Sequence, residues 1–188
     1  MPLFKIIENS QASLNPSDLP RANGGVLLFA RFFNLAVRVP IPPLDSNGYL
    51  PPGIRECTLP EIEAAFATSI HRGKLFDGLV RYADLLRSCG VLRFLYVNGS
   101  FTTSKADPGD VDVVVEYPPA AMFRPLATFF TQVGQVDANK KKFYVHPMFV
   151  PYNNEAGCVA YFQSIRVDES LAKKLPPSFR KGLLRVTL

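Results

Sequence analysis

The sequence predicts an α/β (α+β) fold in which a short mixed β-sheet is flanked by helices. Apolar residues recur at helical spacing from Arg72 to Ser88, and two runs typical of buried strands follow at Leu92–Val97 and Val111–Val115. Three further runs have the composition of short strands: Phe143–Val150, Val159–Val167 and Gly182–Leu188. This mixture of helical and strand patterns in one chain favours a sheet covered by helices.

Length and composition are those of a folded globular domain. The 188 residues suffice for a sizeable core, and 47% of them are hydrophobic while 20% are charged. No apolar run approaches the roughly 18 residues of a membrane helix, and the first residues lack the apolar core of a signal peptide. The cysteines form no Cys-x-x-Cys motif and no even disulfide set, so we expect reduced thiols, no zinc site and a cytoplasmic location: Cys57, Cys89 and Cys158.

The net charge of +5 fits a phosphorylated ligand or a nucleic acid, but it equally fits an ordinary solvated surface. Much of the charge comes from two groups, Lys140–Lys142 and a tail cluster of Lys173, Lys174, Arg180, Lys181 and Arg185. No nucleic-acid-binding motif accompanies either group. A solvated basic face and a polyanion site therefore both stay open.

Two parts are expected along the chain, an N-terminal extension at residues 1–38 and a single domain at residues 39–188. The apolar stretch Val26–Val39 suits a helix or a strand equally well. Three explanations stay open for the extension: it docks on the domain, it forms a homo-oligomer, or it consists of non-native residues from an upstream start codon. We favour docking or oligomerisation, because an exposed apolar stretch would promote aggregation.

The first part of the domain is expected to be an extended strap followed by a helix. Residues 39–53 carry five prolines, which favour an extended surface segment with a turn at Asp45–Gly48. Thr58 then caps a helix, because Glu61 stands at the capping-box position and Pro60 is tolerated in the first turn.

Helix ends are signalled farther along the chain by glycine and proline. Gly90 is expected to end the second helix as its C-cap. Pro118-Pro119 interrupts the chain, and a third helix is expected to follow and to end at Gly134. Asp137 and Asn139 are expected in a loop before the lysine run.

The polar stretch between the two central strands has the residues of a nucleotide site. Asp110 and Asp112 point to the same face of a strand, and two such charges repel each other unless a cation lies between them. Oxygen ligands favour Mg²⁺ or Mn²⁺ as that cation. On spacing alone, a solvated strand end with two unconnected acids stays open as the alternative. Gly99 lets the backbone approach a ligand, Ser100 adds a hydroxyl and an N–H for a phosphate, and Lys105 adds a positive charge.

This pattern resembles the signature of the DNA polymerase β nucleotidyltransferase superfamily. There, a Gly-Ser turn like Gly99-Ser100 is followed about ten residues later by an Asp-x-Asp strand, here Asp110-Val111-Asp112. The chain is most similar to small bacterial nucleotidyltransferase-like proteins, and this likeness covers about residues 39–188. It is carried by three segments: Leu50–Ile54, Asn98–Val113 and Lys181–Val186.

The resemblance implies a metal-dependent transfer reaction. Asp110 and Asp112 would bind Mg²⁺ with a nucleoside triphosphate, while Ser100 and the backbone of Gly99 would hold the β- and γ-phosphates. A hydroxyl on a protein or an RNA would attack the α-phosphate, and pyrophosphate would leave. The small bacterial relatives further imply a toxin–antitoxin or phage-defence setting, in which a partner protein or a tRNA is modified.

One departure from active superfamily members concerns the third carboxylate, which usually comes from a later strand. The corresponding stretch, Phe143–Phe149, contains no Asp or Glu, and His146 stands there instead. Three roles stay open for His146: a ligand to Mn²⁺, the general base, or a simple strand residue. Glu116 shares the face of the two acids, but we expect it to be a surface carboxylate at the strand end.

A second hypothesis follows from this missing acid. The domain would be catalytically inactive and would act as a nucleotide- or partner-binding module, for example a non-catalytic antitoxin. The retained Gly-Ser and Asp-x-Asp favour the enzyme, because a pure binding module needs no adjacent carboxylates.

Overall fold

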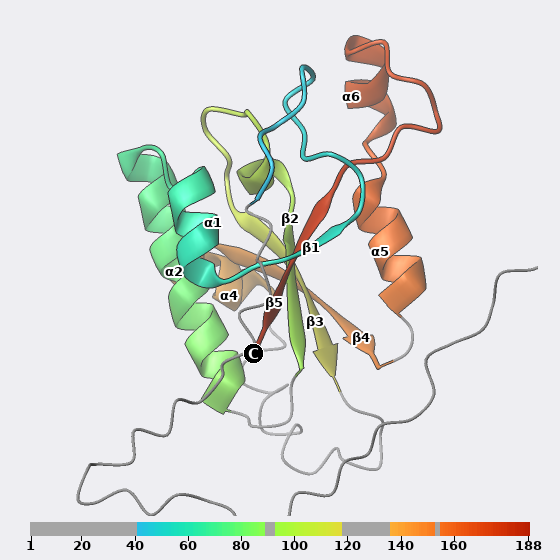
Figure 1. Ribbon diagram of the computed structural model, residues 1–188. Helices are drawn as coiled ribbons and strands as arrows, with labels where there is room; N and C mark the ends of the chain where they lie inside the picture. Colours follow the sequence, from blue (N-terminus) through green and yellow to red (C-terminus); the bar gives the residue numbers. More distant parts are fainter. Residues whose placement is uncertain (1–40, 89–92, 118–135, 153–154) are drawn as a thin grey trace, which may run out of the picture. The chain divides into compact units, whose positions relative to one another are not determined.

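A computed structural model of the chain describes residues 41–88, 93–117, 136–152 and 155–188, and these form a mixed α/β structure with a five-stranded sheet (Figure 1). The strands are β1 Ile54–Glu56, β2 Phe94–Asn98, β3 Val111–Tyr117, β4 Val145–Pro151 and β5 Leu183–Thr187. The helices are α1 Leu59–Phe66, α2 Ile70–Ser88, α4 Val136–Phe143, α5 Glu155–Gln163 and α6 Val167–Ala172, and a short 3-10 turn covers Ser100–Thr102.

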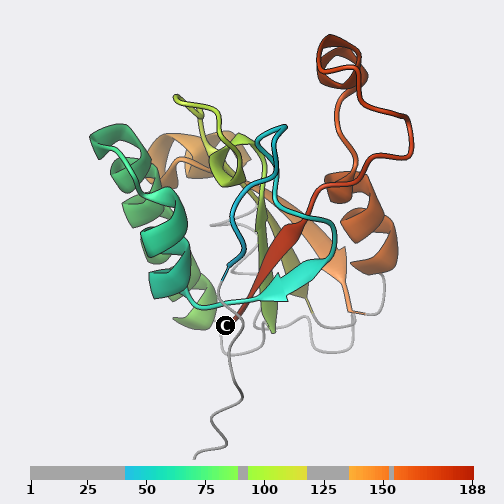
Figure 2. The ribbon, with the colours of Figure 1, turned by 45° about the horizontal axis from the view of Figure 1, so that its top comes forward.

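The sheet is mixed, as the sequence predicts, with the strand order β1-β5-β2-β3-β4 (Figure 2). β5 pairs in parallel with β1 and antiparallel with β2, whereas β3 pairs antiparallel with β2 and in parallel with β4. The register places Asn98 opposite Asp112, and Asp112 opposite His146. Residues opposite each other share a face, so these three polar side chains form one row across three strands.

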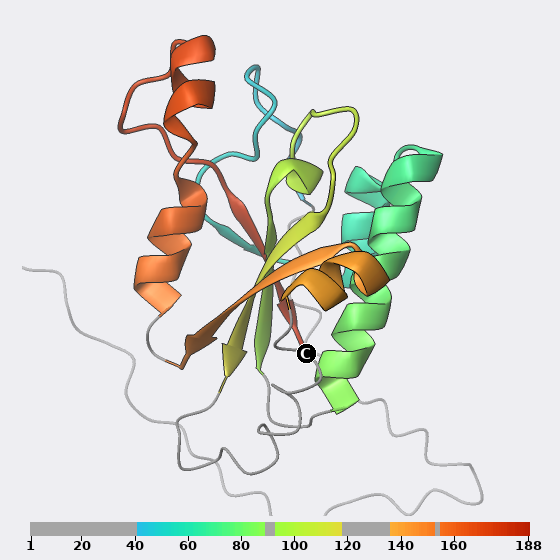
Figure 3. The ribbon, with the colours of Figure 1, turned by 180° about the vertical axis from the view of Figure 1, so that it is seen from behind.

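Helices cover both faces of the sheet. Alternate residues of β3 such as Val113 join the main core with α1 and α2, and α4 lies against both α2 and β4 (Figure 3). On the other face, Val114 packs with Val159 and Phe162 of α5. Asn98, Asp112 and His146 lie on this second face, at the end of β2 and the starts of β3 and β4. Asn98 contacts Phe162, close to the end of α5.

The capping box and the turn predicted for the first part of the domain are confirmed. The Thr58 hydroxyl accepts a hydrogen bond from the Glu61 backbone N–H at 3.4 Å, while the Glu61 carboxylate accepts one from the Thr58 N–H at 2.6 Å. The turn closes where the Gly48 N–H donates to the Asp45 carbonyl at 2.9 Å. The rest of the strap, from residue 41 to residue 53, has no helix or strand, and the short strand β1 that follows it is an addition to the predicted elements.

Three predictions are wrong. Val159–Val167 is not a strand: α5 extends to Gln163, and because Val159 and Phe162 are three residues apart, they meet the sheet from one helix face. Asp137 and Asn139 lie in α4 instead of a loop, since Asn139 and Phe143, four residues apart, are both buried. Glu116 is only 4% exposed, and the Tyr96 hydroxyl donates to its carboxylate at 3.2 Å.

Several expectations fall outside the described residues, so they stay predictions. They concern the extension at residues 1–38, the C-cap at Gly90, the helix after Pro118-Pro119 and Cys89. Cys57 and Cys158 are free thiols, as expected. Within the described ranges, no helix has both the length and the apolar character needed to cross a membrane.

Candidate functional site

The Gly-Ser turn comes directly after β2 and lies against the Asp112 carboxylate. Gly99 has a φ of +80°, a left-handed conformation that favours glycine. A Cβ at this position would lie 1.8 Å from Asp112 Oδ2, so no other residue type fits without displacing that carboxylate. The backbone at Gly99 thus passes close to an acidic side chain, and such a close approach leaves room for a phosphate beside a cation.

The two predicted acids lie beside each other, and each has a basic neighbour. Burial, together with the charge of Asp110, raises the pKa of Asp112, although His146 and Lys181 partly oppose this shift. His146 Nδ1 lies 3.3 Å from Asp112 Oδ1. Lys140 of α4 forms an ion pair with Asp110 at 2.6 Å, and this contact raises the pKa of Lys140. The lysine run is therefore not wholly a solvated face.

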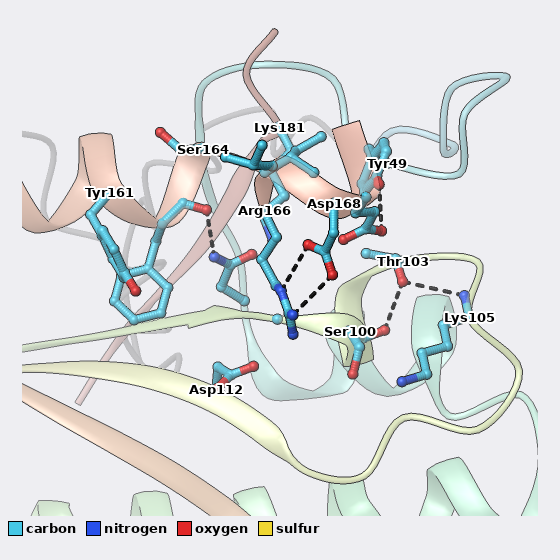
Figure 4. A pocket seen from close by; sticks show the side chains of 16 residues that line it. Tyr49, Ser100, Thr103, Lys105, Asp112, Tyr161, Ser164, Arg166, Asp168 and Lys181 are labelled. Carbon is cyan, nitrogen blue, oxygen red and sulfur yellow. Dashed lines mark hydrogen bonds and ion pairs between the residues drawn. The ribbon is translucent and has the colours of Figure 1, made fainter. Parts of the chain in front are cut away.

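A pocket of about 780 Å³ opens between the Gly-Ser turn and the segment that joins α5 to α6 (Figure 4). It contains four of the predicted site residues, Gly99, Ser100, Lys105 and Asp112. Asp110 and His146 do not line it. The pocket is further lined by Tyr49, Asn98, Thr103, Tyr161, Phe162, Ser164, Ile165, Arg166, Val167, Asp168, Glu169 and Lys181.

Two lysines give the pocket cationic groups that the described residues leave without a carboxylate partner. Arg166 is neutralised by Asp168, whose carboxylate lies 2.9 Å away. Neither Lys105 nor Lys181 forms an ion pair with the described part of the chain. Burial lowers the pKa of Lys181, while Asp112 and Glu169 act in the opposite direction.

The sequence placed Lys181 in a basic tail cluster and in the Lys181–Val186 segment of the resemblance, but it did not predict it as a site residue. It stands immediately before the Gly182–Leu188 strand pattern, and no local motif marks it. Its place in the pocket comes from the pairing of β5 with β2, which brings the start of β5 to the end of β2. Only a prediction of this long-range pairing would have identified it.

Arg72 is a second residue that the sequence did not single out. It is 5% exposed, and its guanidinium donates to the carbonyls of Phe66 at 2.6 Å and Lys105 at 2.8 Å, as well as to that of Phe101. The guanidinium also lies over the Phe101 ring, 5.0 Å from its centroid. These contacts fix the loop that follows the Gly-Ser turn against α2, so the loop is held in place before any ligand arrives.

The donor set fits a divalent cation that arrives with a nucleotide. No group of three or more Asp, Glu, His or Cys side chains suited to a metal ion occurs in the described ranges. Mg²⁺, however, is commonly held by one or two carboxylates together with substrate phosphates and waters. Asp110 and Asp112 supply such oxygens. Burial first, and the charge of Asp110 second, raise the pKa of Asp112, and a bound cation would favour the ionised carboxylate against both effects.

A family model matches residues 42–187, which include every residue of the pocket. The chain belongs to DUF6932, a family of unknown function. No curated protein and no solved structure gives a significant match. The DUF6932 match assigns neither a ligand nor an activity, so the residues of the pocket are the basis for a functional proposal.

Proposed function

We propose that this protein binds a nucleoside triphosphate together with Mg²⁺ or Mn²⁺ and transfers the nucleoside monophosphate to a hydroxyl of a protein or an RNA. The observation that supports it is the Gly99-Ser100 turn packed against Asp112, in a pocket whose Lys105 and Lys181 form no ion pair with the described residues. The resemblance to small bacterial nucleotidyltransferase-like proteins supports the same reaction and suggests a partner protein or a tRNA as acceptor.

Each residue has a role in this reaction that suits its position. Ser100 and the backbone at Gly99 bind the β- and γ-phosphates, and Lys105 and Lys181 neutralise their charge. Asp110 and Asp112 would hold the cation; when bound, it would supply charge neutralisation at the transferred group and activation of the attacking oxygen. The new bond joins the acceptor oxygen to the α-phosphorus, and the bond to the β-phosphate oxygen breaks, so pyrophosphate leaves.

The proton of the attacking hydroxyl needs an acceptor near Asp112. His146 is half exposed and lies beside Asp112 on the neighbouring strand. A neutral imidazole accepts a proton near neutral pH, so we assign His146 the role of general base.

Calorimetric titration with ATP, GTP, CTP and UTP, each with Mg²⁺ or Mn²⁺, tests the proposal. The wild type should bind at least one of them in a metal-dependent way, and Asp110→Asn/Asp112→Asn should lose that binding. The control Asp77→Asn/Asp84→Asn makes the same charge change on exposed positions of α2 outside the pocket and should bind normally. Absence of binding with both metals would refute the proposal.

The second candidate is a module that binds nucleotide without transferring it. One observation favours it: β4 places His146 beside Asp112 and contains no acid, while Lys140 neutralises Asp110. Triphosphates labelled on the α-phosphate, mixed with total RNA or total protein, separate the two candidates. Label transfer that Asp110→Asn/Asp112→Asn abolishes supports the transferase. Metal-dependent binding without any transfer supports the binding module.

A further inference from the structure

Asn98 is a buried polar residue that lines the pocket. It is the last residue of β2, immediately before the Gly-Ser turn, and it is only 2% exposed. It lies opposite Asp112 in the sheet and lines the same pocket. Its side chain therefore shares a face with the acid that would hold the cation.

The amide orientation of Asn98 follows from its one hydrogen bond. Asn98 Nδ2 donates to the Phe162 carbonyl of α5 at 2.7 Å. Because a carbonyl only accepts, the NH₂ group must face Phe162, and Asn98 Oδ1 is the atom that remains. Oδ1 is buried and has no hydrogen-bond partner among the described residues. Buried acceptors are rarely left in this state, and a ligand bound in the pocket that Asn98 lines could supply the donor.

The position of Asn98 limits which group supplies that donor. The triphosphate offers only acceptors at neutral pH, and its β- and γ-phosphates are assigned to the Gly99-Ser100 turn. Asp112, which lies opposite Asn98, is one of the two acids that would hold the cation. The group covalently joined to the α-phosphate is the sugar, whereas the base lies farther away.

We propose that Asn98 Oδ1 accepts a hydrogen bond from a ribose hydroxyl of the bound nucleotide, so that the pocket takes ribonucleotides in preference to deoxyribonucleotides. This inference rests on the proposed function, because it uses the same placement of the triphosphate. It goes further by naming the sugar as the part of the ligand that is recognised and Asn98 as the residue that recognises it.

Calorimetric titration of the wild type with Mg²⁺ and three nucleotides tests the inference: ATP, 2′-deoxy-ATP and 3′-deoxy-ATP. If another base binds more tightly than adenine, the corresponding three nucleotides of that base are used. We expect one deoxy analogue to bind roughly tenfold more weakly, the effect of one buried hydrogen bond. Equal affinity for all three would overturn the inference while leaving the proposed function intact. Absence of binding by every nucleotide would instead remove the proposed function, and the inference with it.

Two variants separate sugar recognition from a merely structural role. Asn98→Ala should weaken ATP binding to the level of the discriminated analogue and leave the affinity for that analogue unchanged. Asn139→Ala removes an equally buried asparagine outside the pocket and should keep the wild-type ratio. If Asn98→Ala weakens all three probes by one factor, or if discrimination survives in it, the inference is overturned. If this variant does not fold, the wild-type comparison decides.

Discussion

The carboxylate of Asp112 lies on a strand, largely withdrawn from water and beside a second acid. Burial and the charge of Asp110 both raise its pKa, so its ionised form is less favourable in the folded chain than in water. A residue that lowers the free energy of unfolding in this way is typical of a functional site, because a bound ligand stabilises its ionised form.

We therefore predict that Asp112→Asn raises the thermal midpoint of the chain at pH 7 in EDTA, because the amide keeps the shape and removes the unfavourable charge. Differential scanning calorimetry measures this midpoint. Asp84→Asn, on an exposed position of α2, should leave it nearly unchanged. A lower midpoint for Asp112→Asn would mean that its contacts with His146 and Lys181 outweigh burial.

Gly99 makes a second prediction at this scale. Gly99→Ala should lower the free energy of unfolding by about 1–3 kcal/mol, because its φ of +80° strains any other residue and the new Cβ would strike Asp112. Chemical denaturation measures the loss.

Gly53→Ala is the matched control for Gly99→Ala. Gly53 also has a positive φ, of +118°, but a Cβ there would meet nothing within 4 Å. Its substitution reports backbone strain alone, so the excess loss in Gly99→Ala measures the close approach to Asp112. Equal losses would show that this approach relaxes without penalty.

At the scale of elements, α2 contains two glycines with opposite roles. A Cβ at Gly78 would lie 1.9 Å from the Phe143 carbonyl at the end of α4, whereas a Cβ at Gly73 would meet nothing within 4 Å. Both residues lower helix propensity, but Gly78 is required for the approach of α4, the helix that carries Lys140 to Asp110.

This difference predicts opposite signs for the same substitution in one helix. Gly73→Ala should raise the free energy of unfolding by up to about 1 kcal/mol, the usual advantage of alanine over glycine in a helix. Gly78→Ala should lower the free energy of unfolding, because α4 must move away. Urea denaturation of the two variants tests this, and a gain in stability for Gly78→Ala would contradict the packing of α2 on α4.

At the scale of the whole domain, the pocket joins segments that are far apart in sequence. Tyr49 of the strap donates its hydroxyl to Glu169 of α6 at 2.5 Å, and the Gly182 N–H donates to the Leu50 carbonyl at 2.8 Å. A ligand in this pocket would contact β2, β3 and the α5–α6 segment together. Binding is therefore expected to stabilise the domain as one unit.

A nucleotide with Mg²⁺ at about one hundred times its dissociation constant should raise the free energy of unfolding by about 2.7 kcal/mol. Thermal denaturation should show this as a higher midpoint, and EDTA should abolish the increase. EDTA alone should not change the midpoint of the ligand-free chain, because the fold is held by apolar packing. A midpoint that falls in EDTA alone would reveal a resident structural metal instead.

The elements whose signals are local are predictable from the amino-acid sequence alone. Helical periodicity identified α2, two apolar runs typical of buried strands identified β2 and β3, and the Thr58–Glu61 capping box located the start of α1. The turn at Asp45–Gly48 was likewise predictable from its residues. The candidate phosphate and metal residues were found because they lie within one short stretch, from Gly99 to Asp112.

The site contacts that depend on pairing between distant segments are visible only in the tertiary structure. The register of β3 with β4 brings His146 to Asp112, and the packing of α4 brings Lys140 to Asp110. The same long-range packing places Lys181 and Asn98 in the pocket. An apolar run such as Val159–Val167 has no local feature that distinguishes a short strand from a helix packed on a sheet. Its helical conformation up to Gln163 follows from packing against the sheet. Local patterns specify backbone conformation, but a site needs a register, and register is a property of the whole sheet.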